Sequence, residues 1–165
     1  MICKSFVECL SLEKKKSDER CEKCKEISSN TNIPCKEKGR RYTLQNDKKL
    51  TIANFWIDGG VYVDKTESKC DRLYYIVDEP KTTVIFIELK GRDIKHALEQ
   101  LIATATQFKG VFENDRKFFR IVCSGAPKIA NDKKCIKLKE TILKLFKTMP
   151  LIKEMKIEEK YSELK

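Results

Sequence analysis

Two carboxylates and one lysine stand at the ends of β-prone segments in the middle of the sequence. Glu88 and Lys90 close the apolar run Thr83–Lys90, and they point to the same side because side chains alternate along a strand. Asp71 begins the preceding segment, and a hairpin that turns near residues 78–82 would place it close to Glu88. Charges at the end of a buried strand are costly unless they are paired or used. The alternative to a functional site is an ion pair at the mouth of a sheet.

The chemistry that suits such a group is metal-dependent hydrolysis. Two neighbouring carboxylates bind Mg²⁺, which takes its other ligands from waters, phosphate oxygens and a backbone carbonyl. The metal lowers the pKa of a water and neutralises charge that develops on phosphorus, while Lys90 positions or activates the nucleophile. The residues therefore predict hydrolysis of phosphodiester bonds.

The elements around this group can be read from the hydrophobic pattern. The run at residues 83–90 is apolar on both alternating faces up to Glu88, which is typical of a central strand buried on both sides. Apolar residues then recur at helical spacing from Ile94 to Phe108, with Asp93 placed as N-cap and Gly110 just past the end. A further strand follows at residues 117–124. The order strand, helix, strand predicts a βαβ crossover.

Less regular patterns flank this unit. Leu50–Ile57 and Val61–Val63, separated by Asp58-Gly59-Gly60, predict a hairpin. The remaining expectations are a strand at residues 72–77, a second helix around 136–149 that Pro150 ends, and an edge strand or short helix in 151–165.

Asp71, its spacer of sixteen residues and Glu88-Leu89-Lys90 together resemble the core of the PD-(D/E)XK nucleases, the restriction-endonuclease-like superfamily. That family carries an Asp, a variable spacer and then (D/E)-x-K on consecutive strands. Gly91 after the lysine suits the pattern, and Gln100 falls where many members carry a polar residue that faces the site. The resemblance covers about residues 55–125.

The resemblance implies a fold and a set of roles. The fold would be α/β, a restriction-endonuclease-like core with a mixed central β-sheet flanked by helices. Asp71 and Glu88 would ligate Mg²⁺, or Mn²⁺ in its place, with help from the Leu89 carbonyl. Lys90 would serve the water or the transition state, and Gln100 would orient the cluster. The chain departs from the pattern in having Cys70 where the family often has Pro. The extra acid that many members supply has two weak candidates, Asp64 and Glu67.

Length and composition agree with one compact domain. The chain has 165 residues and 19.2 kDa, with 41% hydrophobic and 36% charged residues, which excludes a disordered acidic chain. Residues 1–42 are polar and punctuated by Ser, Asn and Pro, so they predict a basic, Cys-containing N-terminal segment that buries little. Residues 43–165 would form the nuclease-like domain.

The net charge of +10 favours a polyanionic partner. We expect nucleic acid, DNA rather than RNA, with Arg92, which directly follows the motif, as the best placed phosphate contact. Arg40 and Arg41 are further candidates, for which the alternative is a solvated face. Because one site cuts one strand, a homodimer is a further expectation. The sequence offers no signal segment and no run long enough to cross a bilayer, so the prediction is a cytoplasmic protein with no membrane partner.

The cysteines allow a second metal. Cys21 and Cys24 form a C-x₂-C pair, and Cys35, with Cys9 upstream, would complete a structural Zn²⁺ site that orders the N-terminal segment. The alternative is reduced thiols without metal.

These observations leave three functions open. The first is a Mg²⁺-dependent endonuclease acting on DNA. The second is a non-catalytic nucleic-acid-binding or interaction protein on the same fold. The third is a small zinc-stabilised regulator in which Glu88 and Lys90 are structural.

Overall fold

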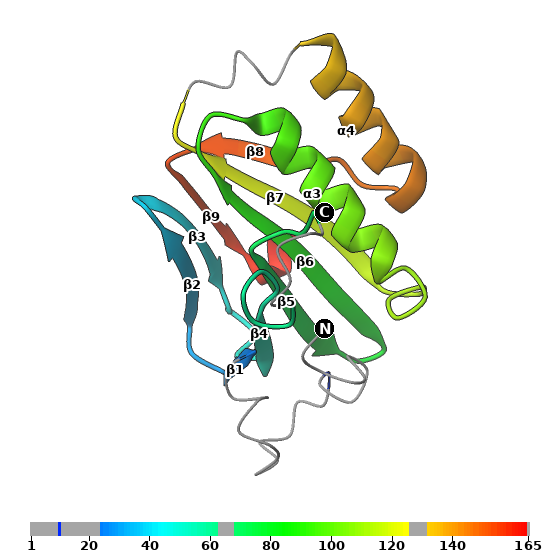
Figure 1. The fold of residues 1–165 in the computed structure, drawn as a ribbon. Coiled ribbons are helices and arrows are strands. Elements are labelled where there is room, and N and C mark those ends of the chain that lie inside the picture. The colour runs from blue at the N-terminus through cyan, green and yellow to red at the C-terminus, as the bar shows by residue number, and fades with distance from the viewer. Residues whose placement is uncertain (1–9, 11–23, 63–67, 126–131, 165) are drawn as a thin grey trace.

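A computed structural model describes residues 10, 24–62, 68–125 and 132–164, and these residues form an α/β structure with two sheets, two α-helices and a short 3-10 helix at Tyr161–Glu163 (Figure 1). The larger sheet has six strands, in the spatial order β1-β4-β5-β6-β7-β8. The smaller has three, in the order β2-β3-β9. The strands are β1 (Lys25–Ser28), β2 (Asn32–Glu37), β3 (Arg40–Gln45), β4 (Ile52–Trp56), β5 (Arg72–Asp78), β6 (Lys81–Lys90), β7 (Arg116–Cys123), β8 (Leu151–Glu154) and β9 (Lys156–Lys160).

The predicted βαβ crossover is confirmed. Strand β6 pairs with β7 in parallel, and helix α3 (Ile94–Gln107) connects them. The Asp93 side chain caps α3 by accepting the His96 N–H over 2.9 Å. Strand β6 is the central strand expected from its composition, because every residue from Thr83 to Leu89 is buried.

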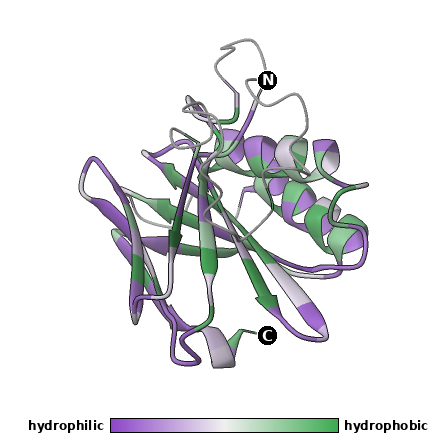
Figure 2. Ribbon diagram, turned by 90° about the horizontal axis from the view of Figure 1, so that it is seen from below, coloured by the Kyte–Doolittle hydropathy of each residue, from purple (hydrophilic) through white to green (hydrophobic). Residues whose placement is uncertain are grey.

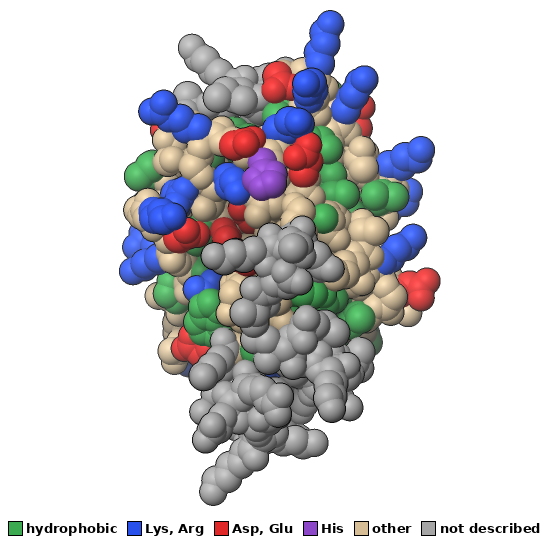
Figure 3. All heavy atoms as spheres, viewed as in Figure 1, with side chains coloured by type: hydrophobic (Ala, Val, Ile, Leu, Met, Phe, Trp, Pro, Cys, Tyr) green, Lys and Arg blue, Asp and Glu red, His purple; other side chains and the backbone are tan. Residues whose placement is uncertain are grey.

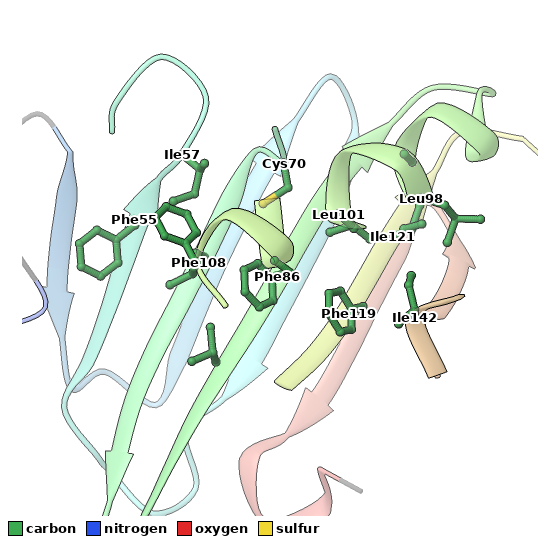
Figure 4. Packing of buried hydrophobic residues seen from close by; sticks show 14 of the residues in the cluster. Phe55, Ile57, Cys70, Phe86, Leu98, Leu101, Phe108, Phe119, Ile121 and Ile142 are labelled. Atoms are coloured by element: carbon green, nitrogen blue, oxygen red, sulfur yellow. The ribbon is translucent and has the colours of Figure 1, made fainter. Parts of the chain in front are cut away.

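The alternation of side chains along β6 divides the core in two. Val84 and Phe86 pack with α3 and helix α4 (Lys133–Phe146), in the cluster drawn in Figure 4. Ile85 and Ile87 pack on the opposite side with residues of β2, β3 and β9. The helices therefore cover one face of the large sheet and the small sheet covers the other, so each strand of the centre is apolar on both sides. In Figure 2 hydrophobic segments follow the strand interiors, and hydrophilic residues mark the hairpin ends.

Residues 25–42 take part in this core, in contrast to the expectation that the N-terminal segment buries little. Strand β1 pairs with β4 at one edge of the large sheet, and β2 and β3 form the hairpin of the small sheet. Ile33, Cys35 and Tyr42 are buried between the two sheets. The boundary expected between residues 42 and 43 falls inside β3. Few apolar residues suffice there because the hairpin needs only one buried face.

The predicted hairpin after residue 50 forms only in part. Strand β4 is present, but the chain beyond Asp58-Gly59-Gly60 folds back as a tight loop, in which the Val61 N–H donates to the Trp56 carbonyl over 2.8 Å. Strand β4 pairs instead with β5, so the hairpin partner is not the next β-prone run. Non-local pairing therefore overrides the local turn signal.

A buried ion pair joins the large sheet to the small sheet. Arg120 on β7 donates to Glu159 on β9 through Nε over 2.6 Å and through a second nitrogen over 3.0 Å. The Tyr42 hydroxyl donates to the same carboxylate over 2.9 Å. This network ties the small sheet to the large one with its charges satisfied.

Candidate functional site

The two sequence-predicted carboxylates meet where β5 begins and β6 ends. These strands are antiparallel, with Arg72 opposite Ile87, so Asp71 comes next to Glu88 where the pairing ends. The Asp71 N–H donates to Glu88 Oε2 over 3.1 Å, and the Leu89 N–H donates to Asp71 Oδ2 over 2.6 Å. The hairpin thus brings together two acids that are far apart in sequence, as the spacing predicted.

Lys90 is held between β6 and α3. Its ammonium lies 3.5 Å from Glu88 Oε1 and donates to Gln100 Oε1 over 2.6 Å. The Gln100 amide in turn donates to the Lys69 carbonyl over 2.7 Å. Gln100 therefore connects the lysine of β6 to the backbone just before Asp71, which places all four predicted site residues in one contiguous cluster.

Burial makes both carboxylates weak acids. Glu88 is 1% exposed, and burial, followed by the negative charge of Asp71, raises its pKa to about 8. Burial also raises the pKa of Asp71 to about 6, against the lowering effect of the Leu89 N–H. The two neighbouring carboxyls therefore hold their protons more tightly than free side chains do.

The donor set suits a hard divalent cation. Asp71 and Glu88 offer carboxylate oxygens and Leu89 offers a backbone carbonyl, and oxygen ligands of this kind are those that Mg²⁺ and Mn²⁺ accept. Among the described residues no group of three or more His, Cys, Asp or Glu side chains is arranged as a metal site. The candidate ligands are accordingly two side chains and one carbonyl, a set that leaves positions for water and substrate. Asp64 and Glu67, the candidates for a further acid, lie outside the described residues.

A cavity of about 220 Å³ opens beside Asp71. It is lined by residues of β2, β4, β5 and β6 and of the loop after β4, namely Lys36, Glu37, Trp56, Asp58, Asp71, Arg72 and Leu89. The Arg72 guanidinium stacks on the Trp56 ring at 4.2 Å from its centroid. Trp56 is half-buried, with one face of its ring covered by Arg72.

Sequence reasoning missed Thr104. Its hydroxyl accepts the Cys70 N–H over 2.8 Å and donates to the Gln100 carbonyl over 2.8 Å, and its side chain is fully buried. Thr104 stands four residues after Gln100, so both lie on the face of α3 that meets the Lys69–Asp71 backbone. That spacing of two polar residues within an apolar helical stripe is the signal that could have revealed it.

The predicted nucleic-acid contacts lie in two places. Arg92 is exposed directly after the site, and Gly125 packs closely against its stem. Arg40 and Arg41 lie at the end of the β2–β3 hairpin, where Arg40 is buried and Arg41 pairs with Glu158 over 2.7 Å. In Figure 3 Lys and Arg side chains lie along the upper and lateral edges of the face that carries α3, and the single histidine, His96, stands beside acidic groups, with Glu99 3.7 Å away.

The two candidate zinc ligands that the structure describes, Cys24 and Cys35, lie in different parts of the core. Cys24 is buried on the helical side, where its thiol donates to the Gly60 carbonyl, and Cys35 is buried between the two sheets. Cys21 and Cys9 lie outside the described residues. Burial raises the pKa of the Cys35 thiol to about 11, which disfavours the thiolate that zinc needs.

In the part of the chain that the structure describes, no helix has the length and hydrophobicity to cross a membrane. Comparisons of the chain with models of protein families, with curated proteins and with solved structures find no match.

Proposed function

We propose that the protein is a metal-dependent endonuclease that hydrolyses phosphodiester bonds in DNA, built on a restriction-endonuclease-like core. The observation that carries this proposal is the cluster of Asp71, Glu88 and Lys90 at the meeting point of β5 and β6, with Gln100 of α3 holding the lysine. A cluster with these four residue types, in this order on two strands and a helix, is what the resemblance implied.

Each residue of the cluster would have a separate role in hydrolysis. Asp71, Glu88 and the Leu89 carbonyl would hold Mg²⁺, which supplies charge neutralisation at the phosphate and a more acidic water. Lys90, kept in place by Gln100, would orient the attacking water and stabilise negative charge on the phosphate oxygens. Arg92 would contact a phosphate of the bound strand.

The buried position of Glu88 supports this reading. A carboxylate that is 1% exposed and shares its surroundings with a second acid costs stability, which the Lys90 ammonium at 3.5 Å offsets only in part, because the pKa of Glu88 stays raised. An ordinary core position would be better occupied by an apolar residue, and the neighbouring positions of β6 are apolar. A function for Glu88 explains why a charge is placed there.

The second candidate function is nucleic-acid binding without cleavage. It is favoured by the hydrogen bonds within the cluster, because the Lys90 ammonium and the Asp71 carboxylate already find partners among protein groups. In that case the cluster would be a structural ion-pair network, and the protein would bind nucleic acid through its basic surface alone.

Cleavage assays separate the two candidates. Supercoiled plasmid and single-stranded DNA are incubated with the purified protein in Mg²⁺, Mn²⁺ or EDTA. Nicking or cutting in either metal and none in EDTA supports the nuclease. Retention of DNA in a binding assay, with no product in any metal, supports the binding protein.

A further inference from the structure

A second cavity, of about 340 Å³, lies at the far end of the β2–β3 hairpin. The hairpin turns through Lys38 and Gly39, both with positive φ (44° and 82°), which is the backbone that a two-residue hairpin turn needs. Opposite this turn the chain passes from β8 to β9 at Met155, whose carbonyl accepts the Arg41 N–H over 3.0 Å. The lining residues are Lys36, Gly39, Arg40, Arg41, Met155 and Lys156.

Arg40 is the buried member of this lining. It is 6% exposed, and its Nε donates to the Glu37 carbonyl over 3.1 Å. Within the described ranges no carboxylate lies at ion-pair distance from its guanidinium, in contrast to Arg120, which is equally buried and bidentate to Glu159. Arg40 thus lines the cavity with a guanidinium that has no acidic partner among the described residues.

The rim of the cavity adds positive charge. Lys36 and Lys156 are exposed on either side, and Glu158 is the acid that Arg41 and Lys156 share, at 2.7 Å and 3.7 Å. Cations thus outnumber the described acids that contact them. A buried guanidinium without a counter-charge is costly, and its planar fork matches a phosphate group in particular. The cavity has the composition of a site for a phosphate.

This cavity adjoins the candidate active site. A Cβ added to Gly91 would lie 3.7 Å from Arg40 Nη1, so the guanidinium lies beside the residue that follows Lys90. Lys36 lines both this cavity and the one that contains Asp71. A strand whose phosphate reached Asp71 and Lys90 would therefore carry a neighbouring phosphate toward Arg40.

We propose that Arg40 and its surrounding cations form a phosphate-binding subsite for a nucleic-acid strand, which anchors the group next to the one at Asp71 and Lys90. The inference rests on the proposed function for the nature of the strand. The phosphate could be an internal diester or the terminal monoester of a strand end, and both present the same anionic oxygens to the guanidinium.

The test measures binding without cleavage. Wild-type protein, Arg40→Gln, Arg40→Lys and Lys144→Gln are titrated in EDTA with inorganic phosphate by calorimetry and with a fluorescent oligonucleotide by anisotropy at several salt concentrations. Lys144 is exposed on α4, so its variant removes one positive charge away from the cavity. Thermal melts with and without phosphate show whether each variant is folded and whether phosphate stabilises it.

The expected result is phosphate binding by the wild type that weakens about tenfold or more in Arg40→Gln and is partly kept in Arg40→Lys. The slope of log affinity against log salt for the oligonucleotide should fall by about one in Arg40→Gln. Because Arg40 is buried, Lys36→Gln at the exposed rim serves as a second variant and should weaken both ligands to a smaller degree.

A pair of oligonucleotides with and without a 5′-phosphate identifies the source. An equal effect of Arg40→Gln on both indicates an internal diester, and a larger effect on the phosphorylated strand indicates a terminal phosphate. The proposal is overturned if the wild type does not bind phosphate, or if Arg40→Gln and Lys144→Gln bind both ligands alike. Since no step needs cleavage, these outcomes do not depend on whether the protein is a nuclease.

Discussion

Asp71 and Glu88 each accept a backbone N–H from the other's strand: Asp71 N–H donates to Glu88 Oε2 over 3.1 Å, and Leu89 N–H donates to Asp71 Oδ2 over 2.6 Å. The two acids are thereby fixed to the β5–β6 pairing itself. Their relative position therefore depends on the register of that pairing, and the position of any cation they bind would depend on it too.

The raised pKa of Glu88 predicts a pH-dependent stability. The pKa of about 8 lies above the ordinary value, so the folded state binds more protons than the unfolded state between about pH 4.5 and 8. The contribution of Glu88 is thus fully present below about pH 4.5 and is lost as pH rises through 8.

Glu88→Gln removes this titration. In EDTA, urea unfolding should show a variant that is more stable than the wild type at pH 9, by on the order of a few kcal/mol, and similar to it at pH 5. Asp78→Asn, at an exposed ion pair with Lys48, is the control and should not show this gain. Parallel pH profiles for wild type and Glu88→Gln would contradict the expectation.

Metal binding should release protons. Asp71 and Glu88, with pKa values of about 6 and 8, are partly protonated near neutral pH and must ionise to ligate Mg²⁺ or Mn²⁺. Calorimetry at pH 7 in buffers of different ionisation enthalpy should show net proton release, and affinity should rise from pH 6 to pH 8. Metal affinity that is independent of pH in this range would show that these acids are not the ligands.

Gln100→Ala should lower the rate of cleavage more than it lowers the stability of the protein. The amide holds Lys90 over 2.6 Å and the Lys69 carbonyl over 2.7 Å, so its removal frees the lysine. We expect kcat to fall by about tenfold to a hundredfold with little change in DNA affinity, because Gln100 positions a catalytic group. Glu99→Ala, one residue earlier and exposed on α3, is the matched control. A drop in affinity equal to the drop in kcat would argue against a positioning role.

Thr104→Val should destabilise the protein by about 1–3 kcal/mol, because it leaves the buried Cys70 N–H without its acceptor while keeping the shape of the side chain. Thr104→Ser keeps the hydroxyl and should recover most of this loss. Chemical denaturation of the three proteins measures the difference. Equal losses in Val and Ser would indicate that packing, not the hydrogen bond, is what Thr104 supplies.

Parts of this arrangement could be predicted from the sequence because they depend on local periodicity. The alternation in Thr83–Lys90 identifies the central strand, and Asp93 before a helical stripe identifies the start of α3. Asp71 could be matched to Glu88 because one hairpin joins their strands.

Other parts depend on contacts that no local pattern contains. Strand β3 pairs in parallel with β9, which is more than a hundred residues away, and this pairing creates the cavity at Arg40. The charge of Arg40 predicts a phosphate contact, yet its burial and its place beside Gly91 follow only from the packing of two sheets. Thr104 was missed for the same reason, since its partner Cys70 lies on another element.

Cleavage of supercoiled plasmid in Mg²⁺ by wild type, Lys90→Ala and Lys95→Ala from parallel preparations tests the nuclease assignment directly. Lys95 is exposed on α3 and pairs with Glu99, so its variant changes the same charge away from the site. We predict metal-dependent cleavage by wild type and Lys95→Ala, and a loss of about a hundredfold or more in Lys90→Ala with DNA binding retained. Equal cleavage by all three proteins, or none by any of them in either Mg²⁺ or Mn²⁺, would contradict the assignment of Lys90 to a nuclease site.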